Sequence, residues 1–84
     1  MLDKFMYFVY ILECIDGSYY TGSTNDITKR FKNHINGKGG RYTRSHKPIK
    51  VIYKENFKTK SDALKREVQI KKLNKKEKLI LINT

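Results

Sequence analysis

Residues 5–23 of this 84-residue chain read FMYFVYILECIDGSYYTGS, and this stretch decides the fold. Residues 5–14 are rich in aromatic and β-branched side chains, and both alternating sets are apolar, as in a strand covered on both faces. Asp16-Gly17 is a strong hairpin signal, because glycine accepts the positive φ of a tight turn. We therefore predict two antiparallel strands, at 5–14 and 18–23, with helices packed around the sheet.

A helix is expected directly after this hairpin. Residues 24–26 are Thr, Asn and Asp, which cap helix N-termini, and Gly37 supplies a stop. Between these signals Ile27, Phe31 and Ile35 recur every four residues. This spacing predicts one apolar helix face.

The rest of the chain predicts one more strand and two more helices. Thr59 followed by Asp62 resembles a capping box. We expect a basic, glycine-rich loop at 37–48, a third strand at 49–57, a helix at 60–73 and a short helix at 74–84. The order ββαβαα indicates an α+β fold, with a small three-stranded antiparallel sheet flanked by helices. We expect residues 1–84 to form a single domain.

The charge of the chain points to a polyanionic partner. Lys and Arg number 19 against 8 Asp and Glu, a formal net charge of +11 at pH 7. Between residues 27 and 60, Glu55 is the only acidic residue. Nucleic acid is the commonest cellular polyanion, and it attracts such a chain through counterion release. Solubility alone requires a net charge of only about 2–8, so we predict contact with nucleic acid.

Other classes of protein are disfavoured. Cys14 is the only cysteine, so a disulfide framework and a zinc cluster are excluded, and we expect Cys14 in the core. The apolar run at 5–12 is too short to span a membrane, and it carries no secretory cleavage pattern. We expect a cytoplasmic protein without membrane contact.

Five polar or aromatic side chains are candidates for chemistry. The predicted hairpin places Tyr10 and Tyr20 near each other across the sheet. Arg30 and His34 lie four residues apart on one helix face, beside its apolar stripe. Glu67 points toward the core side of a later helix, where a carboxylate needs a cationic partner or a metal. Taken singly, each has an ordinary explanation in core packing, helix surface or ion pairing.

Together, these residues resemble the GIY-YIG nuclease family, and especially its short, single-domain, UPF0213-like branch. The tripeptide at 8–10 precedes the one at 20–22, Arg30 follows Tyr20 by ten residues, and His34 comes one helical turn later. The stretches at 20–24, 29–34, 41–44, 63–67 and 70–73 extend the likeness to nearly the whole chain. Phe8 replaces the Gly of the family name and Thr21 replaces its Ile, so the tyrosines and Gly22 carry the match.

The resemblance implies a metal-dependent endonuclease with assigned roles. Glu67 would hold a divalent cation, Mg²⁺ or Mn²⁺, and Arg30 would clamp the phosphate. Either tyrosine would position and deprotonate the attacking water, with His34 sharing or relaying the proton, and the identity of the base stays open. Asn74, seven residues after Glu67, is a further candidate on the same helical face.

The basic residues of the first helix and the following loop are candidates for substrate binding. An aromatic among basic residues suits single-stranded or distorted nucleic acid, although Tyr42 can instead complete the active site. A mobile, solvated loop is the plain alternative, and His46 receives no role. The candidate nucleic-acid-binding residues are Lys29, Lys38, Arg41, Tyr42, Arg44 and Lys47.

Two functions remain in competition. The favoured one is hydrolysis of DNA phosphodiester bonds, and a role in DNA repair or processing follows only by analogy. With no room for a target-choosing domain, specificity would come from DNA shape, from a partner protein, or hardly at all. The alternative is a non-catalytic module that binds DNA or RNA, for which Glu67 has no use.

Overall fold

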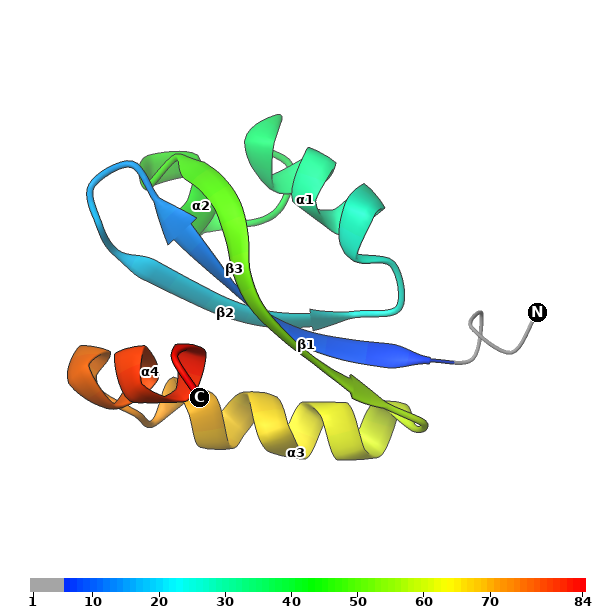
Figure 1. Cartoon of the computed structure of the whole chain (residues 1–84). Coiled ribbons are helices and arrows are strands. Elements are labelled where there is room, and N and C mark those ends of the chain that lie inside the picture. The colour runs from blue at the N-terminus through cyan, green and yellow to red at the C-terminus, as the bar shows by residue number, and fades with distance from the viewer. Residues whose placement is uncertain (1–5) are drawn as a thin grey trace.

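The computed structural model describes residues 6–84 and contains the predicted sheet. The elements are β1 (Tyr7–Cys14), β2 (Tyr19–Thr24), α1 (Ile27–Ile35), α2 (Arg41–Ser45), β3 (Pro48–Phe57), α3 (Lys60–Lys71) and α4 (Lys75–Ile82). The strands are antiparallel in the order β2-β1-β3, with β1 in the centre. α1 and α2 lie on one side of the sheet, and α3 and α4 on the other (Figure 1). The α+β fold is therefore confirmed.

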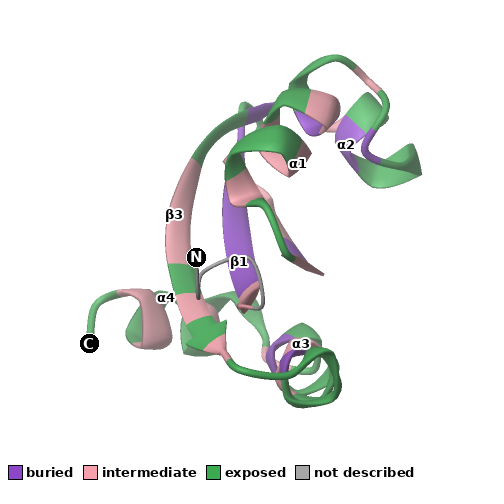
Figure 2. Ribbon diagram, turned by 90° about the vertical axis from the view of Figure 1, so that its right-hand side faces the viewer, coloured by how far each residue is buried: buried purple, intermediate pink, exposed green. Residues whose placement is uncertain are grey.

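The central strand β1 is covered on both faces, as its sequence predicts. All four residues at 9–12 are at most 2% exposed, and β1 is the most continuously buried element in Figure 2. Val9 and Ile11 pack with Ala63 and Ile70 of α3 in the core cluster. Side chains alternate along a strand, so Tyr10 and Leu12 point to the opposite, α1 side. Cys14 is buried as predicted. Phe5 lies outside the described residues.

The prediction of a structureless loop at 37–48 is wrong, because this segment contains the short helix α2. Gly37 and Gly40 have positive φ values of 77° and 127°, and they turn the chain on either side of a tight loop. Thr43 of α2 is buried. Five residues make little more than one turn, so α2 leaves no apolar periodicity in the sequence.

Helix α1 begins as expected but buries a different residue. Asp26 is its N-cap and accepts a hydrogen bond from the backbone N–H of Lys29. Ile35, which the spacing placed on the apolar face of this helix, is 45% exposed and does not pack into the core. His34 is instead the buried residue of this helix. His34 can be buried because the Tyr10 hydroxyl lies beneath α1 and forms a hydrogen bond with the imidazole.

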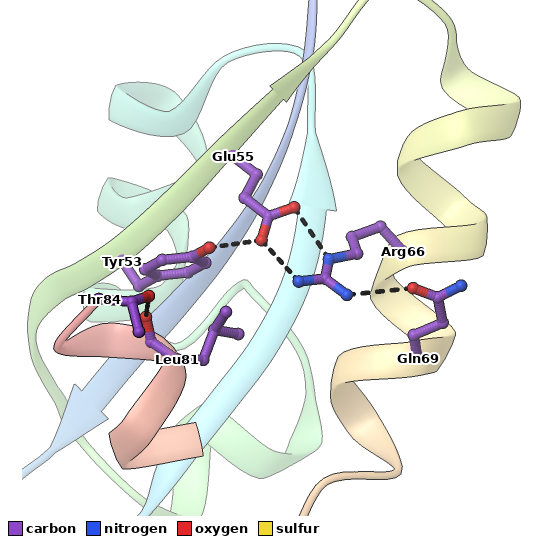
Figure 3. A network of polar contacts seen from close by, with 6 residues as sticks. All are labelled: Tyr53, Glu55, Arg66, Gln69, Leu81 and Thr84. Atoms are coloured by element: carbon purple, nitrogen blue, oxygen red, sulfur yellow. Dashed lines mark hydrogen bonds and ion pairs between the residues drawn. The ribbon is translucent and has the colours of Figure 1, made fainter. Parts of the chain in front are cut away.

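Helix α3 is tied to the sheet by an ion pair on the β3 side (Figure 3). Arg66 donates to both carboxylate oxygens of Glu55, over 2.9 and 3.0 Å. Tyr53 also donates to Glu55, and Arg66 donates to Gln69. At the start of the helix, Thr59 accepts from the backbone N–H of Asp62, one half of the predicted capping box.

Helix α3 ends before Asn74, and this corrects the interpretation of Asn74. α3 ends at Lys71, and Asn74 is the N-cap of α4 in a reciprocal capping box with Glu77. Asn74 is therefore not on a helical face shared with Glu67. The candidate catalytic role for Asn74 rested on that shared face and is withdrawn. No helix within residues 6–84 is long and apolar enough to cross a membrane.

Candidate active site

Gly22 allows the two candidate tyrosines to meet. Tyr10 of β1 pairs with Gly22 of β2, and Tyr20 lies two residues along β2. A Cβ on Gly22 would stand 2.5 Å from the Tyr10 hydroxyl oxygen, so only glycine lets this ring lie across β2. The ring centroids of Tyr10 and Tyr20 are 6.4 Å apart. The predicted proximity of the tyrosines is thus present in the structure.

His34 is held between two hydroxyl groups in a buried position. Its Nε2 lies 2.8 Å from the Tyr10 hydroxyl, and its Nδ1 lies 2.8 Å from Thr43 Oγ1. Thr43 donates in turn to the carbonyl of Gly40, over 3.5 Å. Because Thr43 donates its one hydroxyl proton to Gly40, it accepts a hydrogen bond from the Nδ1–H of His34. The network therefore assigns a neutral imidazole that accepts from Tyr10 at Nε2.

Burial keeps both members of this pair uncharged at neutral pH. Burial raises the pKa of Tyr10 to about 12, although the nearby Arg30 opposes the rise, and the neighbouring Tyr20 and Glu67 add to it. Burial, reinforced by the positive charge of Arg30, lowers the pKa of His34 to about 4. Tyr10 consequently holds its proton tightly, and His34 acts as an acceptor that orients it.

Arg30 lies beside this pair and reaches toward the loop before α2. Its Nη2 donates to the carbonyl of Gly39, over 3.4 Å. A Cβ on Gly39 would stand 2.1 Å from His34 Nδ1, so the loop backbone packs directly on the imidazole. Thr43 and Gly39 are site residues that the sequence reasoning missed. The RYTR stretch contained Thr43, but a threonine in a loop gave no signal of its own.

A stack of aromatic rings leads away from Tyr20. The Tyr20 ring meets His34 edge-on at 5.0 Å between centroids and stacks with Tyr42 at 5.8 Å. Tyr42 stacks with His46 at 4.1 Å, and His46 Nδ1 lies 2.6 Å from a carboxylate oxygen of Asp16. Hydrogen bonds from Ser18 and His46 hold the pKa of Asp16 well below its usual range. His46, which received no role from sequence, therefore supports Tyr42.

Glu67 lies on the α3 side of β2, where its side chain is only 15% exposed. One oxygen accepts from Ser23 Oγ at 2.6 Å, and the other lies 2.7 Å from Lys71 Nζ. Burial favours the protonated acid, but Lys71 and Ser23 outweigh it and hold the pKa of Glu67 below its usual range. The predicted cationic partner is thus Lys71. Ser23 is a further contact that sequence reasoning missed.

The donor set at Glu67 suits a weakly held divalent cation. Among residues 6–84, no group of three His, Cys, Asp or Glu side chains is arranged to hold a metal. One ionised carboxylate is a hard oxygen ligand, and Mg²⁺ keeps most of its own waters when protein ligands are few. Lys71 already places a positive charge at this carboxylate. A single-ligand Mg²⁺ or Mn²⁺ site therefore fits Glu67, in competition with Lys71.

The five candidate residues lie on the two faces of the sheet near β2. Tyr10, Tyr20 and His34 meet on the α1 side, with Arg30 beside Tyr10 and His34. Glu67 contacts Ser23, the neighbour of Gly22, whose side chain points to the α3 side. β2 is an edge strand, so both groups border the same open edge.

The sequence and the fold match known proteins over nearly the whole chain. A family model described as the GIY-YIG catalytic domain matches residues 6–80. The chain belongs to the GIY-YIG family. The UPF0213 protein of Staphylococcus saprophyticus is 48% identical over 82 residues, 98% of each chain. That of Cupriavidus necator is 50% identical over 72 residues, 86% of this chain and 78% of its own.

A solved structure agrees with the fold of this GIY-YIG protein. The solution structure of the UPF0213 protein from Bacillus halodurans aligns with a TM-score of 0.60 and 41% sequence identity. The alignment covers 93% of this chain and 83% of that one. The chain is accordingly a UPF0213-like protein with a nuclease-type domain.

The candidate substrate-binding residues of this GIY-YIG domain all lie at the surface. They are on α1, on α2 and in the segments next to α2, on the side of the sheet that carries Tyr10 and His34. Tyr42 is 37% exposed. The six exposed residues are Lys29, Lys38, Arg41, Tyr42, Arg44 and Lys47.

Proposed function

We propose that this GIY-YIG domain is a metal-dependent endonuclease that hydrolyses phosphodiester bonds in DNA. The observation that carries the proposal is that Tyr20 and Arg30 lie beside Tyr10 on the α1 side of the sheet, while Glu67 contacts Ser23 of the edge strand β2 from the α3 side. Hydrolysis needs an oriented water, a positive group on the phosphoryl oxygens and help for the leaving oxygen. These three side chains offer one group for each need.

Tyr20 and Tyr10 have different tasks in this mechanism. Tyr10 is buried, donates to His34 and has a pKa of about 12, so it is a poor proton acceptor at neutral pH. Tyr20 is only half-buried, and its ring packs against His34 and Tyr42. We assign to Tyr20 the contact with the attacking water, and to Tyr10 and His34 the orientation of the surrounding site.

Arg30 and Glu67 act on the phosphate. Arg30 uses one guanidinium nitrogen for the Gly39 carbonyl, which leaves N–H groups to hold two phosphoryl oxygens. Glu67 is ionised and fixed by Ser23, so it is ready to bind a hydrated Mg²⁺ or Mn²⁺. A divalent cation bound there supplies Lewis-acid stabilisation of the leaving oxygen.

The surface of the α1–α2 side supports contact with the nucleic-acid backbone. Four exposed basic residues at 38–47 flank Tyr42 and His46 in the sequence, and these two rings belong to the stack that begins at Tyr20. Stacked rings also accept unpaired bases. DNA is favoured over RNA by the family likeness, and a role in DNA repair or processing rests on that analogy alone. The proposal leaves target choice to DNA shape or to a partner protein.

Cleavage of a panel of nucleic acids tests this function. Supercoiled plasmid, branched DNA, single-stranded DNA and single-stranded RNA are each incubated with Mg²⁺, Mn²⁺ or EDTA. We expect metal-dependent cleavage of at least one DNA substrate and none in EDTA. Salt-sensitive binding without cleavage of any substrate would favour the non-catalytic binding module. Cleavage of RNA alone would correct the substrate.

A further inference from the structure

Helix α4 turns one of its lysines toward the protein and two of its four apolar residues toward solvent. Leu81 and Ile82 pack against the core cluster. Lys78 precedes them by three and four positions, so it shares their helical face, and it is half-buried. Leu79 and Ile80 are 41% and 60% exposed. An ordinary amphipathic helix would show the reverse arrangement.

Within residues 6–84, no carboxylate lies within ion-pair distance of the ammonium group of Lys78. Glu77, its neighbour in sequence, is engaged with Asn74 in the capping box. Burial lowers the pKa of Lys78, and the positive charge of Lys71 lowers it further. A half-buried cation without an ion-pair partner destabilises the fold unless an anion joins it.

Two more lysines place their ammonium groups along β2 on this side. Lys71 lies 2.7 Å from Glu67, which contacts Ser23 near the end of β2. Lys75 donates to the Gly17 carbonyl over 2.5 Å, and its ammonium lies 5.0 Å from the centroid of the Tyr19 ring. Tyr19 to Ser23 spans about 13 Å of strand, at about 3.3 Å per residue. Along the axis of a duplex, this length corresponds to about four phosphates of one strand, at about 3.4 Å each.

We propose that Lys71, Lys75 and Lys78 form a phosphate-binding track along β2, on the α3–α4 side of the sheet. The inference rests on the proposed function for the nature of the substrate. The track binds backbone phosphates of the nucleic acid next to the bond that is cleaved at Glu67. It makes the C-terminal helix a substrate-binding element, in addition to the exposed basic residues of α1 and α2.

A purely structural role for Lys78 is the competing explanation. A lysine can cover apolar surface with its methylene groups while its ammonium reaches water. In that case, methionine at position 78 would keep the packing. The loss of the charge would then weaken binding no more than the loss of any exposed lysine. Lys76 is a matched control, because it is an exposed lysine of the same helix.

Salt-dependent binding and thermal unfolding separate the two explanations. Anisotropy of a fluorescein-labelled single-stranded DNA oligonucleotide is measured in EDTA, over a series of salt concentrations, for wild type, Lys78→Met, Lys78→Arg and Lys76→Met. We expect Lys78→Met to reduce the magnitude of the slope of log K against log salt by about 0.7, the loss of one phosphate contact on a single strand. We also expect its Tm to rise by about 3 °C, because an uncompensated charge is removed. Lys78→Arg keeps the wild-type slope.

Each result decides between the explanations. An equal slope for Lys78→Met and Lys76→Met overturns the track, whatever the change in Tm. A lower Tm with a reduced slope also contradicts it, because Lys78 would then stabilise the fold and disturb binding indirectly. Absence of DNA binding by wild type refutes the proposed substrate and the track together. Cleavage by wild type with equal slopes refutes the track alone.

Discussion

At the scale of single residues, burial sets the chemistry of the Tyr10–His34 pair. The imidazole is 1% exposed and has hydroxyl partners on both nitrogens. Neither partner carries a charge that would favour imidazolium, and Arg30 disfavours it. The pair therefore orients the site through hydrogen bonds between neutral groups. Glu67 differs from Tyr10 and His34, because Lys71 and Ser23 keep its carboxylate ionised.

His34 makes the stability of the fold depend on pH. Its folded pKa of about 4 lies below the unfolded value of about 6.5, so the unfolded chain binds more protons between these pH values. The free energy of unfolding should therefore fall as the pH drops from about 6.5 to about 4, by at most about 3 kcal/mol. Urea unfolding across this range measures the loss.

The two histidines of the chain provide the control for this prediction. His46→Gln should retain the loss of stability, because His46 forms an ion pair at the surface. His34→Gln should lose much less stability over the same pH range, although it starts from a lower value. A pH dependence that is unchanged in His34→Gln would show that other groups cause it.

Glycine is required at position 22 for lack of space and not for its backbone conformation, because Gly22 has no positive φ. Gly22→Ala would place a Cβ 2.5 Å from the Tyr10 hydroxyl oxygen and 2.8 Å from its Cζ. Tyr10 must then move, at a cost of about 1–3 kcal/mol for an overpacked site. We expect a lower Tm and a cleavage rate that falls with it. The variant Gly22→Ala/Tyr10→Phe, which lacks the clashing hydroxyl, should recover part of the stability. Failure to recover any would contradict the assigned clash.

At the scale of elements, α3 is fastened to both edge strands by consecutive residues. Val9 of the central strand pairs with Ser23 on β2 and with Glu55 on β3, so the three form one row across the sheet. Glu67 contacts Ser23 at one end of this row, and Arg66 binds Glu55 at the other. The Arg66–Glu55 pair therefore helps to fix where Glu67 lies.

Breaking this pair should impair catalysis as well as stability. Arg66→Met leaves Glu55 partly buried with Tyr53 as its remaining hydrogen-bond donor, a loss of about 1–3 kcal/mol. A shift of Glu67 by about 1 Å should slow cleavage by about a hundredfold per folded molecule. Single-turnover rates are measured well below the Tm of each variant. Tyr53→Phe, which keeps the ion pair, is the control. An unchanged rate for Arg66→Met would mean that the pair is only structural.

The elements also show what the sequence was able to predict. The strands of the hairpin were predictable, because a two-faced apolar run and Asp16-Gly17 are local signals. Helix α2 was not predictable, because it is held in place by the hydrogen bond between Thr43 and His34, a residue of another helix. The burial of His34 in place of Ile35 likewise depends on Tyr10, on another element. Tertiary contacts of this kind leave no periodicity in the chain.

Within the site, the family pattern identified residues but not their partners. Tyr10, Tyr20, Arg30 and His34 were named from spacing, and the structure brings them together. Ser23, Gly39, Thr43 and Lys71 were missed, since their importance comes from the atoms they contact across the fold.

At the scale of the whole molecule, positive charge borders both sides of the β2 edge. The α1–α2 side carries exposed arginines and lysines around the ring stack, and the α3–α4 side carries the lysine track. Part of the excess positive charge therefore lies on the elements that carry the candidate active site. Binding should come from this wide surface, whereas cleavage should depend on the few groups at the edge of β2. A substitution of Glu67 is therefore expected to reduce cleavage without reducing binding.

The measurement that tests this account most directly is a comparison of Glu67→Gln with wild type. Gln has the shape of Glu, can still accept from Ser23, and cannot supply the anionic oxygen that a cation needs. Single-turnover DNA cleavage in Mg²⁺ should fall at least about a hundredfold, because several kcal/mol of stabilisation are lost. DNA affinity in EDTA should not weaken. Equal cleavage by both proteins would contradict the assignment of Glu67, and with it the proposed active site.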